Sequence, residues 1–135
     1  MNHYRLNNFT MLAGRAMLAA IFIVAGLDKI GGYAGTQAYM QSAGIPGMLL
    51  PAVIALEVAG GIAILVGFQT RILAALLAGF TLIAAIVFHN DFSQQMQSIL
   101  FMKNIAIAGA FLLLVAQGPG AWAFDKRKIH AEVQQ

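Results

Sequence analysis

Four long apolar stretches dominate the chain, at residues about 9–29, 48–67, 70–89 and 100–117. At about 1.5 Å per helical residue, each is close to the length that crosses about 30 Å of hydrocarbon. None of the stretches carries the polar face that a helix at the surface of a soluble domain would turn to water. The pattern predicts an all-α integral membrane protein, with residues 1–135 forming a single four-helix bundle domain.

The connections between these spans differ in length. Residues 67–71 form a very short link, which predicts a tight antiparallel hairpin of spans two and three. Residues 31–47 are a longer connection that contains tyrosines and closes on Gly-Ile-Pro-Gly. We expect a short interfacial helix there, between spans one and two, with a plain loop as the alternative. The Gly-Pro-Gly sequence at 118–120 should end span four, ahead of a basic tail at 121–135.

Composition supports a membrane protein. Hydrophobic residues make up 60% of the chain and charged residues 10%, whereas soluble domains carry about 25% charged residues. The net charge is +3, and no basic patch with interleaved aromatic residues indicates nucleic-acid binding. Cysteine is absent, which excludes thiol–disulfide chemistry, iron–sulfur clusters and covalently attached haem within this chain.

The distribution of basic residues predicts the orientation. With four spans, both termini lie on the same side as the 67–71 link. That side carries Arg5, Arg71, Lys126, Arg127 and Lys128. The positive-inside rule therefore places both termini in the cytoplasm and makes Arg71 a topology anchor.

Ionisable residues inside the spans are the main clue to function, because a charge at the bilayer centre costs about 2.5–3.5 kcal/mol even on lenient scales. Arg15 and Lys29 share one face of span one, and Glu57 lies in span two. Counted from the outer surface, Glu57 lies roughly 12 Å deep and Arg15 roughly 18 Å deep. An Arg15–Glu57 bridge is therefore feasible, since arginine side chains reach about 6 Å. Lys29 or Lys103 reaching Glu57 is the competing arrangement.

These residues predict a polar column in the outer half of the bundle. Its members are Arg15, Lys29, Glu57, His89, Lys103 and Asn104. One interpretation is a pocket for a small anionic or carbonyl-bearing ligand; the other is a set of interhelical ties that fix packing. We identify no catalytic or metal-ligating set, and expect Asp125 to cap or tether the tail. Four glycines are candidates for close helix packing: Gly26, Gly60, Gly61 and Gly79.

Short motifs occur along the chain in a fixed order: an arginine in span one, Gly-x-x-Lys at 26–29, Leu-Glu-x-x-Gly-Gly at 56–61, Gly-Phe-x-Thr-Arg at 67–71, Phe-His at 88–89, Lys-Asn at 103–104 and Gly-x-Gly-x-x-x-x-Asp at 118–125. In this order and spacing they resemble the DoxX family of bacterial inner-membrane proteins. The resemblance covers about residues 9–125 and points to the same six polar residues. It implies a bacterial inner-membrane location and a link to quinone chemistry or oxidative stress.

Three functions remain open at this stage. The first is a redox-linked accessory subunit that handles quinone or another small lipid-soluble molecule, with the redox group on a partner subunit. In that case the protein is at most a subunit of a quinone-linked oxidoreductase, because the chain has no redox group of its own. The second is a small proton-coupled transporter that uses Glu57, and the third is a structural subunit without a ligand. A homo-oligomer is compatible with all three.

Overall fold

The structure, a computed structural model, describes residues 2–126, which form helices joined by turns and loops, with no strand in this range. The elements are α1 (His3–Gly31), α2 (Tyr33–Ser42), the 3-10 turn η1 (Gly47–Leu49), α3 (Leu50–Val66), α4 (Thr70–Phe88) and α5 (Gln95–Gln117). Within the described residues, α1, α3 with η1, α4 and α5 are long and apolar enough to cross a membrane. The prediction of an all-α membrane protein with four spans is therefore confirmed. Most of the basic tail, including Arg127 and Lys128, lies outside the described residues.

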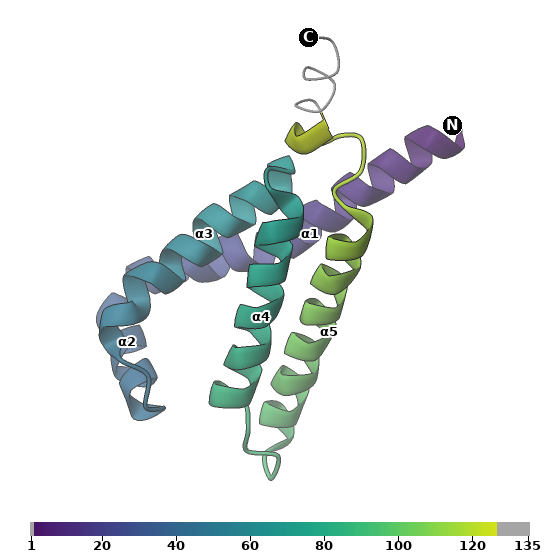
Figure 1. Ribbon diagram of the computed structural model, residues 1–135. Helices are drawn as coiled ribbons and strands as arrows, with labels where there is room; N and C mark the ends of the chain where they lie inside the picture. The colour runs from purple at the N-terminus through teal and green to yellow at the C-terminus, as the bar shows by residue number, and fades with distance from the viewer. Residues whose placement is uncertain (1, 127–135) are drawn as a thin grey trace.

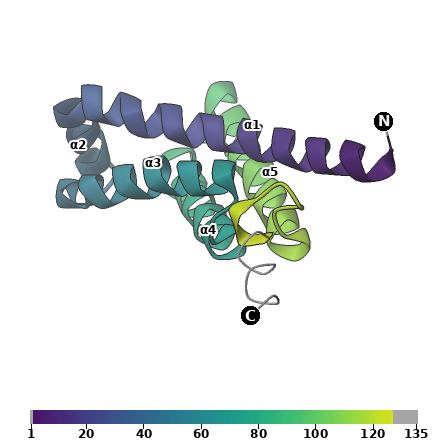
Figure 2. The same ribbon diagram turned by 90° about the horizontal axis from the view of Figure 1, so that it is seen from above.

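The four long helices form two pairs (Figure 1). Helix α1 packs along α3, and α4 packs along α5. The expected tight hairpin of α3 and α4 is wrong, because these helices touch near their connecting turn and then diverge. Gly60 of α3 still faces Leu73 and Leu77 of α4 close to that turn. Figure 2 shows α1 and α3 side by side, with α2 across their far end.

The molecule has two distinct ends (Figure 1). We call the end that holds residues 67–69 the turn end; the start of α1 and residues 118–126 lie there too. The opposite end holds α2 and residues 89–94, and we call it the loop end. A helix thus occupies the connection between spans one and two, as expected, while its position at the membrane interface stays a prediction.

Small residues set the α1–α3 distance. A Cβ on Gly26 would lie 2.5 Å from Val58 Cγ2, and one on Gly61 would lie 2.8 Å from Ile23 Cγ1. Both positions therefore need glycine for the helices to approach this closely. Gly79 differs, since a Cβ there would meet nothing within 4 Å. The expectation that Gly79 packs against a neighbouring helix is wrong within this chain.

The core lies where the two pairs cross. Phe22 of α1 meets Phe111 of α5 edge to face, with ring centroids 5.4 Å apart. Ile64 of α3 and Leu77 of α4 are fully buried in the same cluster. Most other large apolar side chains are exposed, which is the arrangement expected of a protein that meets lipid rather than water. The helix pairs are thus held together in the middle and at the turn end.

Candidate functional site: a pocket between two helix pairs

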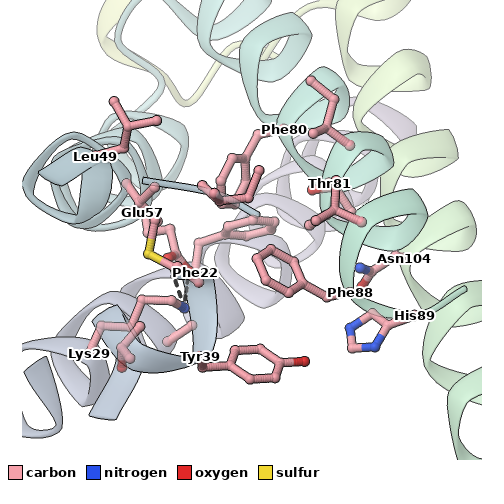
Figure 3. A pocket seen from close by; sticks show the side chains of 18 of the residues that line it. Phe22, Lys29, Tyr39, Leu49, Glu57, Phe80, Thr81, Phe88, His89 and Asn104 are labelled. Carbon is pink, nitrogen blue, oxygen red and sulfur yellow. Dashed lines mark hydrogen bonds and ion pairs between the residues drawn. The ribbon is translucent and has the colours of Figure 1, made fainter. Parts of the chain in front are cut away.

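A pocket of about 480 Å³ lies where the helix pairs diverge (Figure 3). Its volume is within the range of small-molecule sites, about 300–1,000 Å³. The walls come from all five helices and are mostly apolar and aromatic. Four of the six predicted polar residues line it: Lys29, Glu57, His89 and Asn104.

An ion pair forms the polar centre of one wall. Lys29 Nζ lies 2.9 Å from Glu57 Oε1 and donates a hydrogen bond to Oε2 at 3.2 Å. Glu57 is only 3% exposed, and the Lys29 side chain is 29% exposed. Gly26 lies one turn before Lys29, and its missing side chain lets α1 approach the backbone of α3 at Val58. Of the two arrangements that the sequence left open, the structure has Lys29 on Glu57.

Arg15 lies elsewhere, so the alternative arrangement, an Arg15–Glu57 bridge, is not found, and Arg15 does not join the predicted polar cluster. Its guanidinium donates to the carbonyl oxygens of Ile64 at 3.3 Å and Leu65 at 3.2 Å, and to that of Trp122. Helix α1 runs antiparallel to α3 (Figure 2), so residues early in α1 meet the end of α3. Ile64 follows Glu57 by about two helical turns, or roughly 10 Å. Arg15 is 1% exposed and stabilises the carbonyl end of α3 at the turn end.

Lys103 also departs from the predicted cluster. Its side chain is exposed and does not line the pocket. The neighbouring Asn104 is half-buried and does line it. Adjacent residues on a helix point about 100° apart, so the Lys-Asn motif presents one residue to the pocket and turns the other away.

The wall opposite the ion pair carries the polar side chains of His89 and Asn104 (Figure 3). His89 Nδ1 lies 3.0 Å from Gln97 Oε1 across the loop between α4 and α5. With the Gln97 oxygen as acceptor, Nδ1 is the donor of this hydrogen bond. The amide of Asn104 adds a group that can both donate and accept.

Aromatic side chains at the loop end were not singled out from the sequence as part of the site. Tyr39 of α2 stacks on Phe88 of α4, with ring centroids 5.1 Å apart and an interplanar angle of 23°. Both rings line the pocket. In the sequence, Tyr39 is one of the tyrosines of the 31–47 connection and Phe88 belongs to the Phe-His motif, and neither position indicated a pocket. A stacked pair that joins two separate helices leaves no local sequence signal that could have found it.

The turn end is held by residues 118–125, which we call the C-terminal segment. The Asp125 carboxylate accepts hydrogen bonds from the backbone N–H groups of Gln69 at 2.8 Å and Thr70 at 3.0 Å. It thereby caps α4, whose own preceding residue supplies no side-chain cap. Asp125 N also donates to the Gly67 carbonyl oxygen at 3.0 Å. Gly67 has a positive φ of 76°, and a side chain there would collide with Ala123.

Asp125→Asn removes the negative charge at the start of α4 and is expected to lower the free energy of unfolding by about 0.3–1 kcal/mol at neutral pH, the usual value of a charge at a helix terminus. Burial alone would raise the pKa of the Asp125 carboxyl, but hydrogen bonds from Thr70 and Gln69 and the charge of Arg15 lower it overall. A lowered pKa means that the ionised form contributes stability above the ordinary value of about 3.9. That contribution disappears as the pH falls through the lowered value.

Thermal unfolding in detergent between pH 7 and pH 2 checks this expectation. The wild-type and Asp125→Asn curves should converge in acid. Asp91→Asn is the matched control, since Asp91 is exposed on the 89–94 loop and bonds the neighbouring Ser93. A constant difference between wild type and Asp125→Asn over the whole range would contradict the capping role.

The fold and pocket define a class: a multi-pass helical membrane protein with a largely apolar pocket around a buried ion pair. The sequence matches the DoxX family over residues 10–90, from the first span to the end of α4. The chain belongs to the DoxX family.

Three relatives were compared with the chain. Inner membrane protein YqjF of Escherichia coli (strain K12) is 50% identical, over 90% of this chain and 94% of its own length. Inner membrane protein YphA of the same organism is 42% identical, over 87% of this chain and 89% of its own length. A Bacillus subtilis (strain 168) protein named "Putative oxidoreductase CatD" is 38% identical over 54% of each chain. No solved structure matches the chain significantly.

Proposed function

We propose that this DoxX-family protein is a redox-linked accessory protein that binds a quinone or a related small lipid-soluble molecule in the pocket between its helix pairs. The observation that carries the proposal is the pocket of about 480 Å³ with largely apolar walls and the Lys29–Glu57 pair in one of them. A quinone ring needs apolar and aromatic surroundings and a few hydrogen-bond donors for its carbonyl oxygens. An isoprenoid tail could lie along the apolar walls.

The polar groups suit such a ligand. An ammonium group has three N–H donors, and Lys29 directs its charge to Glu57 while remaining partly exposed to the pocket. Asn104 supplies an amide on the opposite wall. The name of the Bacillus subtilis relative, "Putative oxidoreductase CatD", supports a redox connection over about half of the chain. The redox group itself would belong to a partner subunit.

The proton-coupled transporter is the weaker candidate. Such a transporter needs a carboxylate that protons and substrate can compete for. Glu57 has Lys29 against both of its oxygens. A pocket-lining pair of this kind favours ligand binding over proton exchange.

The orientation with both termini in the cytoplasm is part of the proposal. The start of α1, Arg71 and the C-terminal segment share the turn end (Figure 1), where basic residues gather. The pocket would then open toward the periplasmic side. Because the chain has no cysteine, a cysteine introduced at Ser93 can be labelled specifically in whole cells. A membrane-impermeant thiol reagent added outside the cells is expected to label Ser93→Cys. Absence of labelling would contradict the proposed orientation and indicate the opposite one.

Cross-linking with an azido-naphthoquinone in lipid nanodiscs tests the ligand. Label is expected on peptides of α1, α3 and α4 that line the pocket, and unlabelled 1,4-naphthoquinone should compete. Ala84→Phe places a ring in the pocket and should reduce labelling at least about tenfold, equivalent to about 1.4 kcal/mol of binding. Ala75→Phe is the matched control, because Ala75 is exposed on the same helix and does not line the pocket. Labelling that is equal in the two variants would refute the proposed site.

A further inference from the structure

The charges in the pocket lining cancel. Among the described residues that line it, Lys29 and Glu57 carry the formal charges at neutral pH, one positive and one negative. Lys29 Nζ lies 2.9 Å from Glu57 Oε1 and 3.2 Å from Glu57 Oε2. The remaining polar groups of the lining are hydroxyls, an amide and an imidazole. The pocket therefore offers hydrogen bonds without a net charge.

Neither partner of the ion pair is free for an ion of opposite charge. Glu57 is 3% exposed, so its carboxylate can meet a ligand cation only if Lys29 moves away. A ligand anion at Lys29 would have to approach a site that already contains the Glu57 carboxylate. In both cases a charged ligand loses its hydration shell, and no net opposite charge in the pocket compensates for that cost, so its binding is weakened.

One uncharged ligand group does fit beside the pair. Lys29 keeps donor capacity, because its ammonium has three N–H groups and its side chain is 29% exposed. An oxygen that accepts a hydrogen bond can approach Lys29 without displacing Glu57. The ring of such a ligand would lie among Phe22, Phe80 and Phe88, whose side chains line the same space (Figure 3).

We propose that the Lys29–Glu57 pair makes the pocket selective for uncharged, ring-bearing ligands with an acceptor oxygen, and excludes anions and cations of the same shape. This inference rests on the proposed function, because it concerns the ligand of the same pocket. It assigns the two residues a role in specificity: each neutralises the other and so removes the preference that a single charge would create.

Three probes with one ring system test the selectivity. They are 1,4-naphthoquinone, which is neutral, 1-naphthoate, an anion, and 1-naphthylmethylammonium, a cation. Binding is measured by calorimetry on protein in phosphatidylcholine nanodiscs, whose lipid has no net charge. Values for Ala84→Phe are subtracted, so that partition into lipid does not count as binding. Wild type is expected to bind the neutral probe at least about tenfold more tightly than either ion.

Variants of the pair should shift the preference in opposite directions. Glu57→Gln leaves Lys29 uncompensated and should tighten naphthoate binding about tenfold. Lys29→Met leaves Glu57 uncompensated and should tighten binding of the ammonium probe by about the same factor. The double variant should again prefer the neutral probe, with weaker binding because the Lys29 donor is gone. Lys103→Met is the control, since Lys103 is exposed outside the pocket and should not alter the ranking.

The outcomes separate the two proposals. If wild type binds naphthoate or the ammonium probe as tightly as naphthoquinone, the selectivity proposal is wrong, whatever the variants do. The same conclusion follows if the ranking of the probes is identical in wild type, Glu57→Gln and Lys29→Met. In both of these results a pocket ligand still exists, so the proposed function survives. If no probe binds wild type above the Ala84→Phe level, both proposals fall together.

Discussion

Replacing Arg15 by methionine is expected to lower the free energy of unfolding by about 1–3 kcal/mol, the cost of leaving a buried hydrogen-bond acceptor without a partner. The guanidinium is 1% exposed and satisfies the carbonyl oxygens of Ile64, Leu65 and Trp122. Methionine has a comparable length but no donors, so the buried carbonyl oxygen of Ile64 would lose its partner, and those of Leu65 and Trp122, which are part-buried, would lose theirs as well. The hydrogen bonds by which Arg15 joins α1 to the end of α3 and to the C-terminal segment would be lost.

Unfolding by increasing denaturing detergent in mixed micelles measures this loss. Arg5→Met is the matched control, because Arg5 lies in the same helix near the same end and is exposed. The control should change stability by no more than about 0.5 kcal/mol, as surface substitutions usually do. Equal effects of the two substitutions would mean that the carbonyl contacts of Arg15 contribute little.

The second large effect is expected for Gly26→Ala. The added Cβ would lie 2.5 Å from Val58 Cγ2, 3.2 Å from Glu57 Cβ and 3.3 Å from the backbone nitrogen of Val58. The Val58 side chain is branched and the other contact is a backbone atom, so neither can move away at low energetic cost. Helices α1 and α3 must therefore separate. Overpacking of this kind costs about 1–3 kcal/mol. The separation should also weaken the Lys29–Glu57 pair and naphthoquinone binding.

Gly79→Ala is the matched control for Gly26→Ala. It adds the same methyl group to a helical glycine that has open space around it. The same denaturing-detergent titration should show a change of no more than about 0.5 kcal/mol for this variant. If Gly26→Ala is as stable as Gly79→Ala, then close contact at Gly26 does not set the α1–α3 distance.

The long apolar runs were sufficient to predict the helices, because only helices and closed β-barrels satisfy the backbone polar groups in lipid, and barrel strands are short segments of alternating polarity. They were not sufficient to predict how the helices pair. A short connection brings α3 and α4 together at residues 67–69 but does not decide the angle at which they leave the turn. That angle depends on which side chains are small, and Gly26 and Gly61 bring α3 onto α1 instead.

The polar site was predicted in part for a similar reason. The number of residues from the end of a span gave the depth of its charged residue in the membrane. The ion pairs that these depths allowed included Lys29–Glu57. Depth alone could not exclude Arg15, because the carbonyl oxygens that bind it are backbone atoms that every sequence possesses. The partner in the C-terminal segment, Trp122, is more than a hundred residues away in the chain. Such long-range contacts leave no periodic signal in one sequence.

The position of Arg15 has a consequence for how the protein is made. This cation enters the membrane with the first helix, before the chain that will bond to it has been synthesised. The carbonyl oxygens of Ile64 and Leu65 emerge later, and that of Trp122 emerges only after all four spans. Arg15 can therefore complete its contacts only after the chain has been synthesised as far as residue 122.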